Sequence, residues 1–289
     1  MPSTAVVADS TSYLPADLLA KHDIRQVSLY VGIEDEQERE SDIADLHAFY
    51  ERLRVSDQTV TTSQPSVGDF ISVYEPLLAD GKEIVSIHIS SGISGTYESA
   101  MQARERLTAE GKGGERIAVS DSRTGAGGMG LMVLAAAAAA EGGASAAEAK
   151  DRAETAREQL QIWFAVDTLD YLRRGGRIGA ARAWIGTTLK IKPILTLEEE
   201  ITPVERVRTR SRAFERLVDY GRRRQEAGAD AWVVQHVQDP ENAARLVEAC
   251  RPFFGSDPVF TSEVGPVIGA HVGPGLLGIG GIPGSLLEP

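Results

Sequence analysis

The feature that most constrains the fold is a repeated alternation of short apolar runs with longer helical segments in the first half of the chain. The apolar runs, each about as long as a buried strand, are residues 5–8, 84–89 and 117–119. The helical segments that follow them are residues 16–21, 97–107 and the alanine-rich stretch 125–140. Strands that alternate with helices pair in parallel and are covered by helices on both faces. We therefore expect an α/β domain.

Three further segments belong to this half. Residues 27–31 alternate weakly and predict another strand, and residues 43–53 and 67–79 have the apolar periodicity of amphipathic helices. A long charged helix is expected over residues 145–161, and the pattern changes after it. We place a domain boundary there, which gives an N-terminal domain of residues 1–158.

The second half, residues 159–289, mixes hairpin connections with crossovers. The expected strands are residues 163–166, 191–197, 201–207, 231–236, 259–263 and 265–271. The expected helices are residues 169–173, 212–221 and 241–251. Strands 191–197 and 201–207 read as a hairpin turning at residues 198–200. Because hairpins pair antiparallel, we predict an α+β domain with a largely antiparallel sheet.

Charge and composition exclude several classes of protein. The chain of 289 residues has a formal net charge of −12, which argues against nucleic acids and anionic membranes as partners. The apolar core of the alanine-rich stretch, residues 131–140, is too short to span a bilayer, so it predicts a buried helix and no membrane insertion. The single cysteine, Cys250, has no disulfide partner and is expected to be a buried structural thiol. With no basic, apolar leader at the N-terminus, we expect a cytoplasmic protein.

Ligands of open parallel sheets bind beyond the carboxyl ends of the strands, which directs attention to residues 90–96. This segment combines glycines, which allow close backbone approach, with hydroxyls and the free amides of a helix start, which can hold an anion. Capping of the following helix by Ser94 or Thr96 is the competing interpretation.

Two other segments offer polar groups to a ligand. Residues 61–66 carry four hydroxyls, of which Ser63 or Ser66 could instead cap the next helix. His271 lies in the glycine-rich segment 265–275, where its immediate neighbours cannot bury it, so it is a candidate ligand-facing donor. The other four histidines are scattered without metal-ligand spacing, and we expect no metal site.

Together these segments resemble the DegV family of bacterial fatty-acid-binding proteins. The matching motifs run almost end to end and occupy residues 7–11, 62–66, 89–100, 121–122, 167–178 and 265–275. The resemblance implies two domains with a fatty acid such as palmitate buried between them, and no cofactor. It also implies that the carboxylate is hydrogen-bonded by Thr62 and Ser94, with His271 in the same site. Arg177 is similar to a family arginine near the pocket mouth and the kinase-facing surface.

In the best-understood members that this chain resembles, the protein does no chemistry itself. It presents the fatty acid to a separate ATP-dependent fatty acid kinase, and the resulting acyl phosphate feeds phospholipid synthesis. The chain departs from the family pattern in two places. Val272 stands where Thr or Ser is frequent, and residues 198–200 are glutamates where an Asn/Asp-Gly turn is usual.

Two enzymatic functions are the alternatives to a lipid carrier. A serine-dependent lipid hydrolase would use Ser94 as nucleophile, His271 as base and Asp121 as the acid that orients it. A nucleophile elbow needs Gly-x-Ser-x-Gly, however, and Thr96 stands where the second glycine is required. A nucleotide-dependent kinase is disfavoured because the chain has no Gly-x-x-x-x-Gly-Lys-Ser/Thr loop.

Overall fold

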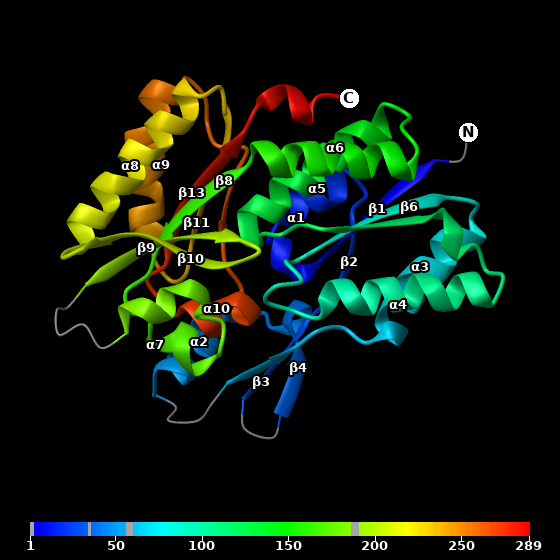
Figure 1. The fold of residues 1–289 in the computed structure, drawn as a ribbon, viewed down its shortest axis with the longest axis horizontal. Coiled ribbons are helices and arrows are strands. Elements are labelled where there is room, and N and C mark those ends of the chain that lie inside the picture. Colours follow the sequence, from blue (N-terminus) through cyan, green and yellow to red (C-terminus); the bar gives the residue numbers. More distant parts are fainter. Residues whose placement is uncertain (1–2, 34–35, 56–59, 186–190) are drawn as a thin grey trace.

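The computed structural model describes residues 3–33, 36–55, 60–185 and 191–289, and three β-sheets organise them (Figure 1). The first sheet has the order β2-β1-β6-β7, and all of its strand pairs are parallel. Its strands are β1 (Thr4–Asp9), β2 (Arg25–Val27), β6 (Glu83–His88) and β7 (Ile117–Asp121). The predicted parallel α/β arrangement is confirmed.

Helices cover both faces of this sheet because alternate residues of its strands are apolar on each side. Val7 of β1 packs with α3 (Val67–Ala79) and α4 (Thr96–Ala109), whereas Val6 faces α5 (Ala126–Glu141) and α6 (Ala146–Gln159). Helix α6 begins with a capping box in which Ser145 and Glu148 bond each other's backbone amides. The short α1 (Ala16–Lys21) follows β1.

The second sheet has the order β10-β9-β8-β13-β11-β12, and of its pairs only β11 with β12 is parallel. Its strands are β8 (Gln161–Ala165), β9 (Lys192–Glu198), β10 (Glu200–Val207), β11 (Ala231–His236), β12 (Phe260–Glu263) and β13 (Leu277–Ile282). Helices α8 (Arg210–Glu226) and α9 (Pro240–Phe254) cover its outer face. The predicted, largely antiparallel sheet and its hairpin are confirmed.

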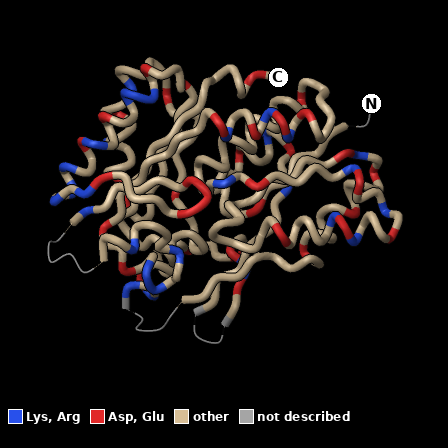
Figure 2. Tube along the Cα trace, viewed as in Figure 1, with Lys and Arg blue, Asp and Glu red and all other residues tan. Residues whose placement is uncertain are grey.

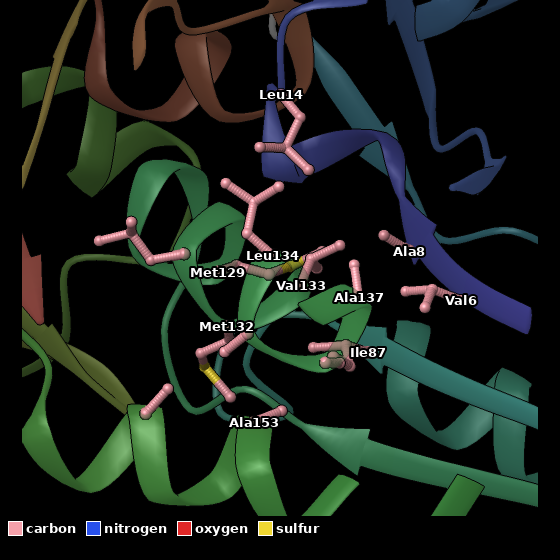
Figure 3. Packing of buried hydrophobic residues seen from close by; sticks show 14 of the residues in the cluster. Val6, Ala8, Leu14, Ile87, Met129, Met132, Val133, Leu134, Ala137 and Ala153 are labelled. Carbon is pink, nitrogen blue, oxygen red and sulfur yellow. The ribbon is translucent and has the colours of Figure 1, made fainter. Parts of the chain in front are cut away.

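Helix α5 lies between the two large sheets and joins their cores. Its side chains pack against Val6 and Ile87 of the first sheet (Figure 3), and they share the same apolar cluster with Val233 of the second sheet. The helix is buried over nearly its whole length, which explains why it is apolar all round. Within the part of the chain that the structure describes, no helix has the length and apolarity needed to cross a membrane.

A third, antiparallel sheet has the order β4-β3-β5 and consists of β3 (Tyr30–Ile33), β4 (Glu36–Arg39) and β5 (Thr61–Ser63). Nearby lie α2 (Leu46–Val55), α7 (Asp170–Arg174) and α10 (Pro266–Val272). Val31 and Tyr50 share an apolar cluster with Phe164 and Leu197 of the second sheet. Residues from the first half thus build part of the core around the second sheet, and the boundary at residue 158 stays a prediction.

Several predicted elements are wrong in type or extent. The single strand expected over residues 27–31 is two strands in different sheets, because β2 ends at Val27 and β3 begins at Tyr30. The segment 265–271, expected as a strand, is helix α10, which begins at Pro266 in the first helical turn. The central strand β13 was not predicted, since its Leu-Gly-Ile-Gly-Gly-Ile sequence has low intrinsic strand propensity.

Candidate functional site

A cavity opens between the third sheet, the loop after β6, helix α10 and the inner face of the second sheet. Most of its wall is apolar, and that part is formed by Leu29, Ile89, Ile93, Ala126, Ile162, Phe164, Leu172, Leu197, Ile201, Val264, Val267, Ile268, Val272 and Leu276. The polar side chains in the wall are Thr62, Ser63, Gln64, Ser94, Arg177, Gln235 and His271. All four sequence-predicted site residues therefore line one cavity. Of the segments expected to form a tunnel, the alanine-rich helix contributes only its first turn and strand β9 only Leu197.

Thr62 and His271 are brought into direct contact by the third sheet and α10. Thr62 is the central residue of β5, where it pairs with Val31 of β3. His271 lies in the last turn of α10. The Oγ1 atom of Thr62 and the Nε2 atom of His271 are hydrogen-bonded at 2.7 Å. These two residues, 209 positions apart, form one polar unit in the cavity wall.

The imidazole of His271 is held in the uncharged state by its surroundings. Burial, the larger effect, and the nearby charge of Arg177 together lower the pKa of His271 to about 4. Its Nδ1 atom is buried without a hydrogen-bond partner among the described residues. That atom faces the backbone of Gly175, where a Cβ would lie only 2.0 Å from it. At neutral pH the site therefore contains an uncharged imidazole that is joined to Thr62 by one hydrogen bond.

Ser94 lies in the loop between β6 and α4, the position expected for a ligand-binding loop. Its Oγ is 2.8 Å from Oγ1 of Thr96, which is fully buried. The N-cap of α4 is Gly95, which makes no side-chain capping bond, so the interpretation of Ser94 or Thr96 as a cap is wrong. In the other segment, Ser66 does cap α3, by accepting from the amide of Asp69. Capping and cavity lining are thus divided among neighbouring hydroxyls.

Arg177 is exposed and lines the cavity, which places it at the mouth. Its Nε donates to the carbonyl of Ile93 at 3.3 Å, and another guanidinium nitrogen donates to the carbonyl of Gly175 at 2.8 Å. Ile93 adjoins Ser94, and Gly175 abuts His271. Arg177 therefore links the two segments that carry the polar groups.

The hydrolase arrangement is not formed. Asp121 accepts from the hydroxyl of Ser91 at 2.5 Å and from the amide of Arg123 at 2.9 Å. His271 is bonded through Nε2 to Thr62, and over the described ranges no carboxylate contacts its Nδ1. An imidazole with a pKa of about 4 is also too weak a base to accept the proton of a serine hydroxyl efficiently at neutral pH. Across residues 3–33, 36–55, 60–185 and 191–289, no three His, Cys, Asp or Glu side chains gather as metal ligands.

Sequence reasoning assigned no role at this site to several residues, among them Gln235 in the cavity wall and the three described next. Thr96 backs the hydroxyl of Ser94, Gly175 makes room for the imidazole of His271, and Gln64 packs against Gly95, where a Cβ would lie 2.9 Å from Nε2. Thr96 and Gln64 were each visible in a recognised motif but had no partner assigned. Gly175 also lay in a matching motif, residues 167–178, but its role could not be predicted because it depends on the ring of His271, nearly a hundred positions away.

A mainly apolar cavity with a few neutral hydrogen-bonding side chains on its wall is the kind of site that binds an apolar ligand with a polar end. The chain belongs to the DegV family, described as a family of uncharacterised proteins, whose model matches residues 3–284. A DegV domain-containing protein of Clostridium acetobutylicum is 40% identical over 276 residues, which cover 95% of each chain.

Two solved structures are similar over almost the whole chain. The crystal structure of DegV from Bacillus subtilis, described as a fatty acid binding protein, has a TM-score of 0.87 and 34% identity. The match covers 98% of this chain and 100% of the Bacillus subtilis chain. A DegV family protein from Thermus thermophilus, described by its fatty acid binding, has a TM-score of 0.86 and 33% identity. The match covers 97% of this chain and 99% of the Thermus thermophilus chain. The predicted family and two-part fold are confirmed.

Proposed function

We propose that this protein binds a long-chain fatty acid, with the tail in the apolar part of the cavity and the carboxylate at Thr62, Ser94 and His271. The observation that carries the proposal is the Thr62–His271 hydrogen bond in a cavity whose wall is otherwise mainly apolar. Each buried methylene contributes about 0.8 kcal/mol, so the tail supplies most of the affinity and the polar groups fix its orientation.

The hydrogen bonds within the site suit an acceptor-only ligand. When Nε2–H of His271 donates to Oγ1 of Thr62, the hydroxyl proton of Thr62 is left free for a carboxylate oxygen. Thr96 can support Ser94 in the same way, by donating to its Oγ. The two hydroxyls then offer two donors without a buried cation. Neutral donors can hold a carboxylate and also adjust to its phosphorylated product, whereas a buried arginine would clamp the anion more rigidly.

Arg177 stands at the mouth, and the adjoining α7 carries the exposed Arg173 and Arg174. Basic positions gather around α7 in Figure 2, although the chain as a whole is acidic. We infer that this side faces a separate fatty acid kinase, to which the protein presents the carboxylate for acyl phosphate formation and phospholipid synthesis in the cytoplasm. In this proposal the protein is a carrier with no catalysis of its own.

Native mass spectrometry of freshly purified protein, followed by lipid extraction, tests the binding function. We expect a long-chain fatty acid to be released in roughly equimolar amount. An empty cavity that takes up no labelled palmitate would refute the proposal. Addition of a fatty acid kinase and ATP should give acyl phosphate, trapped as its hydroxamate, only in the presence of this protein. Labelling of Ser94 by a fluorophosphonate would instead revive the hydrolase.

A further inference from the structure

Helix α10, which carries His271, is anchored at its start by two residues from the N-terminal half of the chain. Its N-cap, Gly265, makes no side-chain capping bond, and Pro266 has no amide hydrogen. The amide of Val267 donates to Oε1 of Glu40 at 2.8 Å, and the amide of Ile268 donates to the hydroxyl oxygen of Tyr13 at 3.1 Å. The amides that a helix start leaves free are thus satisfied from outside the helix.

Glu40 and Ser10, which are buried, form a hydrogen-bonded cluster with the half-buried Tyr13. Glu40 is 7% exposed. The same Oε1 that receives the Val267 amide also accepts from the hydroxyl of Tyr13 at 2.8 Å, and Oε2 accepts from Ser10. Ser10 in turn accepts from the amide of Leu29. A carboxylate removed from water is tolerated only with such partners, so this cluster is a built feature of the fold.

The backbone around the cluster indicates that its geometry is closely specified. Tyr13 has φ of 47°, in the left-handed region that a tyrosine rarely adopts. Gly265 lies so close that a Cβ there would be 2.6 Å from the ring of Tyr13 and 2.8 Å from Oε1 of Glu40. Local strain of this kind persists where the surroundings hold it in place.

We propose that Glu40, assisted by Tyr13, is a positioning residue for the headgroup site. Glu40 is not part of the cavity wall, but α10 contributes Val267, Ile268 and His271 to it. Because α10 is a single short helix of seven residues, a shift at its first amides moves His271 relative to Thr62. Recognition of the carboxylate then depends on Glu40 without any contact to the ligand. This inference rests on the fatty acid binding proposed above.

The test compares palmitate with hexadecan-1-ol, which has the same tail length but no carboxylate, on delipidated full-length protein. In Glu40→Gln one oxygen of the carboxylate becomes an amide that cannot accept a hydrogen bond. We expect about tenfold weaker palmitate binding and hexadecanol binding within about twofold of wild type. The matched control is Glu38→Gln, which removes the same charge from an exposed position on β4 and should change neither affinity. Tyr13→Phe, which keeps the ring and removes the hydroxyl, should likewise weaken palmitate binding and leave hexadecanol binding unchanged.

A double-mutant comparison separates positioning from general support of the fold. If Glu40 acts through His271, Glu40→Gln combined with His271→Ala should bind palmitate no more weakly than His271→Ala alone. The positioning role would be overturned if Glu40→Gln weakened the binding of palmitate and of hexadecanol equally. It would also be overturned if the two substitutions reduced palmitate affinity additively in the double variant; in either case the proposed fatty acid binding would stand. Wild-type protein that binds no palmitate would overturn the proposed function, and the positioning role with it.

Discussion

The backbone carbonyl of Glu199 lies against Gly92, in the place that a side chain at position 92 would occupy. A Cβ on Gly92 would be 2.4 Å from the Glu199 oxygen, which also accepts the hydroxyl of Ser90 at 2.7 Å. Glu199 itself has φ of 75°, a conformation in which most residues are strained. The turn between β9 and β10 is therefore docked on the loop that carries Ser94, and this contact joins the second sheet to the site.

Gly92→Ala should loosen that contact, because the atoms in the way are backbone and cannot rotate aside. We expect the free energy of unfolding to fall by about 1–3 kcal/mol. Palmitate binding should weaken as well, since Ile93 and Leu197 beside the contact line the cavity. Urea denaturation and palmitate titration measure the two effects. Gly68→Ala in α3 is the control: its nearest neighbour would be 3.6 Å away, and stability should hold or rise slightly. A Gly92→Ala protein as stable as wild type would contradict the argument.

Thr62→Val tests the polar pair directly, because valine keeps the branched shape of threonine and loses only the hydroxyl. The change removes a donor to the ligand and leaves Nε2 of His271 without its partner. We expect palmitate affinity to fall by about 1.5–3 kcal/mol, the range for a hydrogen bond to a charged group. Calorimetric titration gives the value. Thr61→Val, at the exposed neighbouring position on β5, should bind like wild type. Equal affinities for the two variants would remove Thr62 from the site.

The regular elements of this fold could be predicted because their local signals agree with their tertiary setting. Helices α1 and α3 and strand β11 have the predicted bounds, since apolar periodicity and flanking turn residues mark both ends. Strand β13 was not predicted because three of its six residues are glycines. Its place between β8 and β11 depends on pairing that no local pattern contains. Helix α10 was predicted as a strand because seven residues show too little periodicity to distinguish a helix from a strand.

The site was predictable only as a set of separate motifs. Thr62, Ser94, Arg177 and His271 each stood in a segment of suggestive composition, and the structure brings all four to one cavity. The bond between Thr62 and His271 could not be predicted from spacing, because it depends on β5 pairing with β3 and on α10 being a helix. Whether these residues bind a carboxylate stays a prediction until ligand binding is measured.

Cys250 offers a test of the core beneath α8 and α9. The thiol is fully buried, as expected from the sequence, and burial raises its pKa to about 12. Because the thiolate is the reactive species, iodoacetamide at pH 8 should leave the folded protein unmodified for hours. The same reagent in strong urea should add one label, seen by intact mass. Rapid labelling of the folded protein would mean that α9 separates readily from the sheet.

The uncharged state of His271 predicts how stability depends on pH. Its pKa is about 4 in the folded protein, against an ordinary value of 6.5, so between these values the unfolded chain binds a proton that the folded one does not. The stabilisation is therefore fully present above about pH 6.5 and is lost as the pH falls through about 4. At about 1.4 kcal/mol per pKa unit, the loss amounts to at most about 3.5 kcal/mol.

Urea denaturation of wild type and His271→Asn across pH 4–7 measures this dependence, because asparagine cannot titrate. Burial also lowers the pKa of His236, but that residue is present in both proteins and its contribution cancels in their difference. If His271→Asn keeps the wild-type dependence of stability on pH, the imidazole is charged or solvated in the folded protein. The cavity would then present a cation to its ligand, and the neutral headgroup site inferred from burial would be wrong.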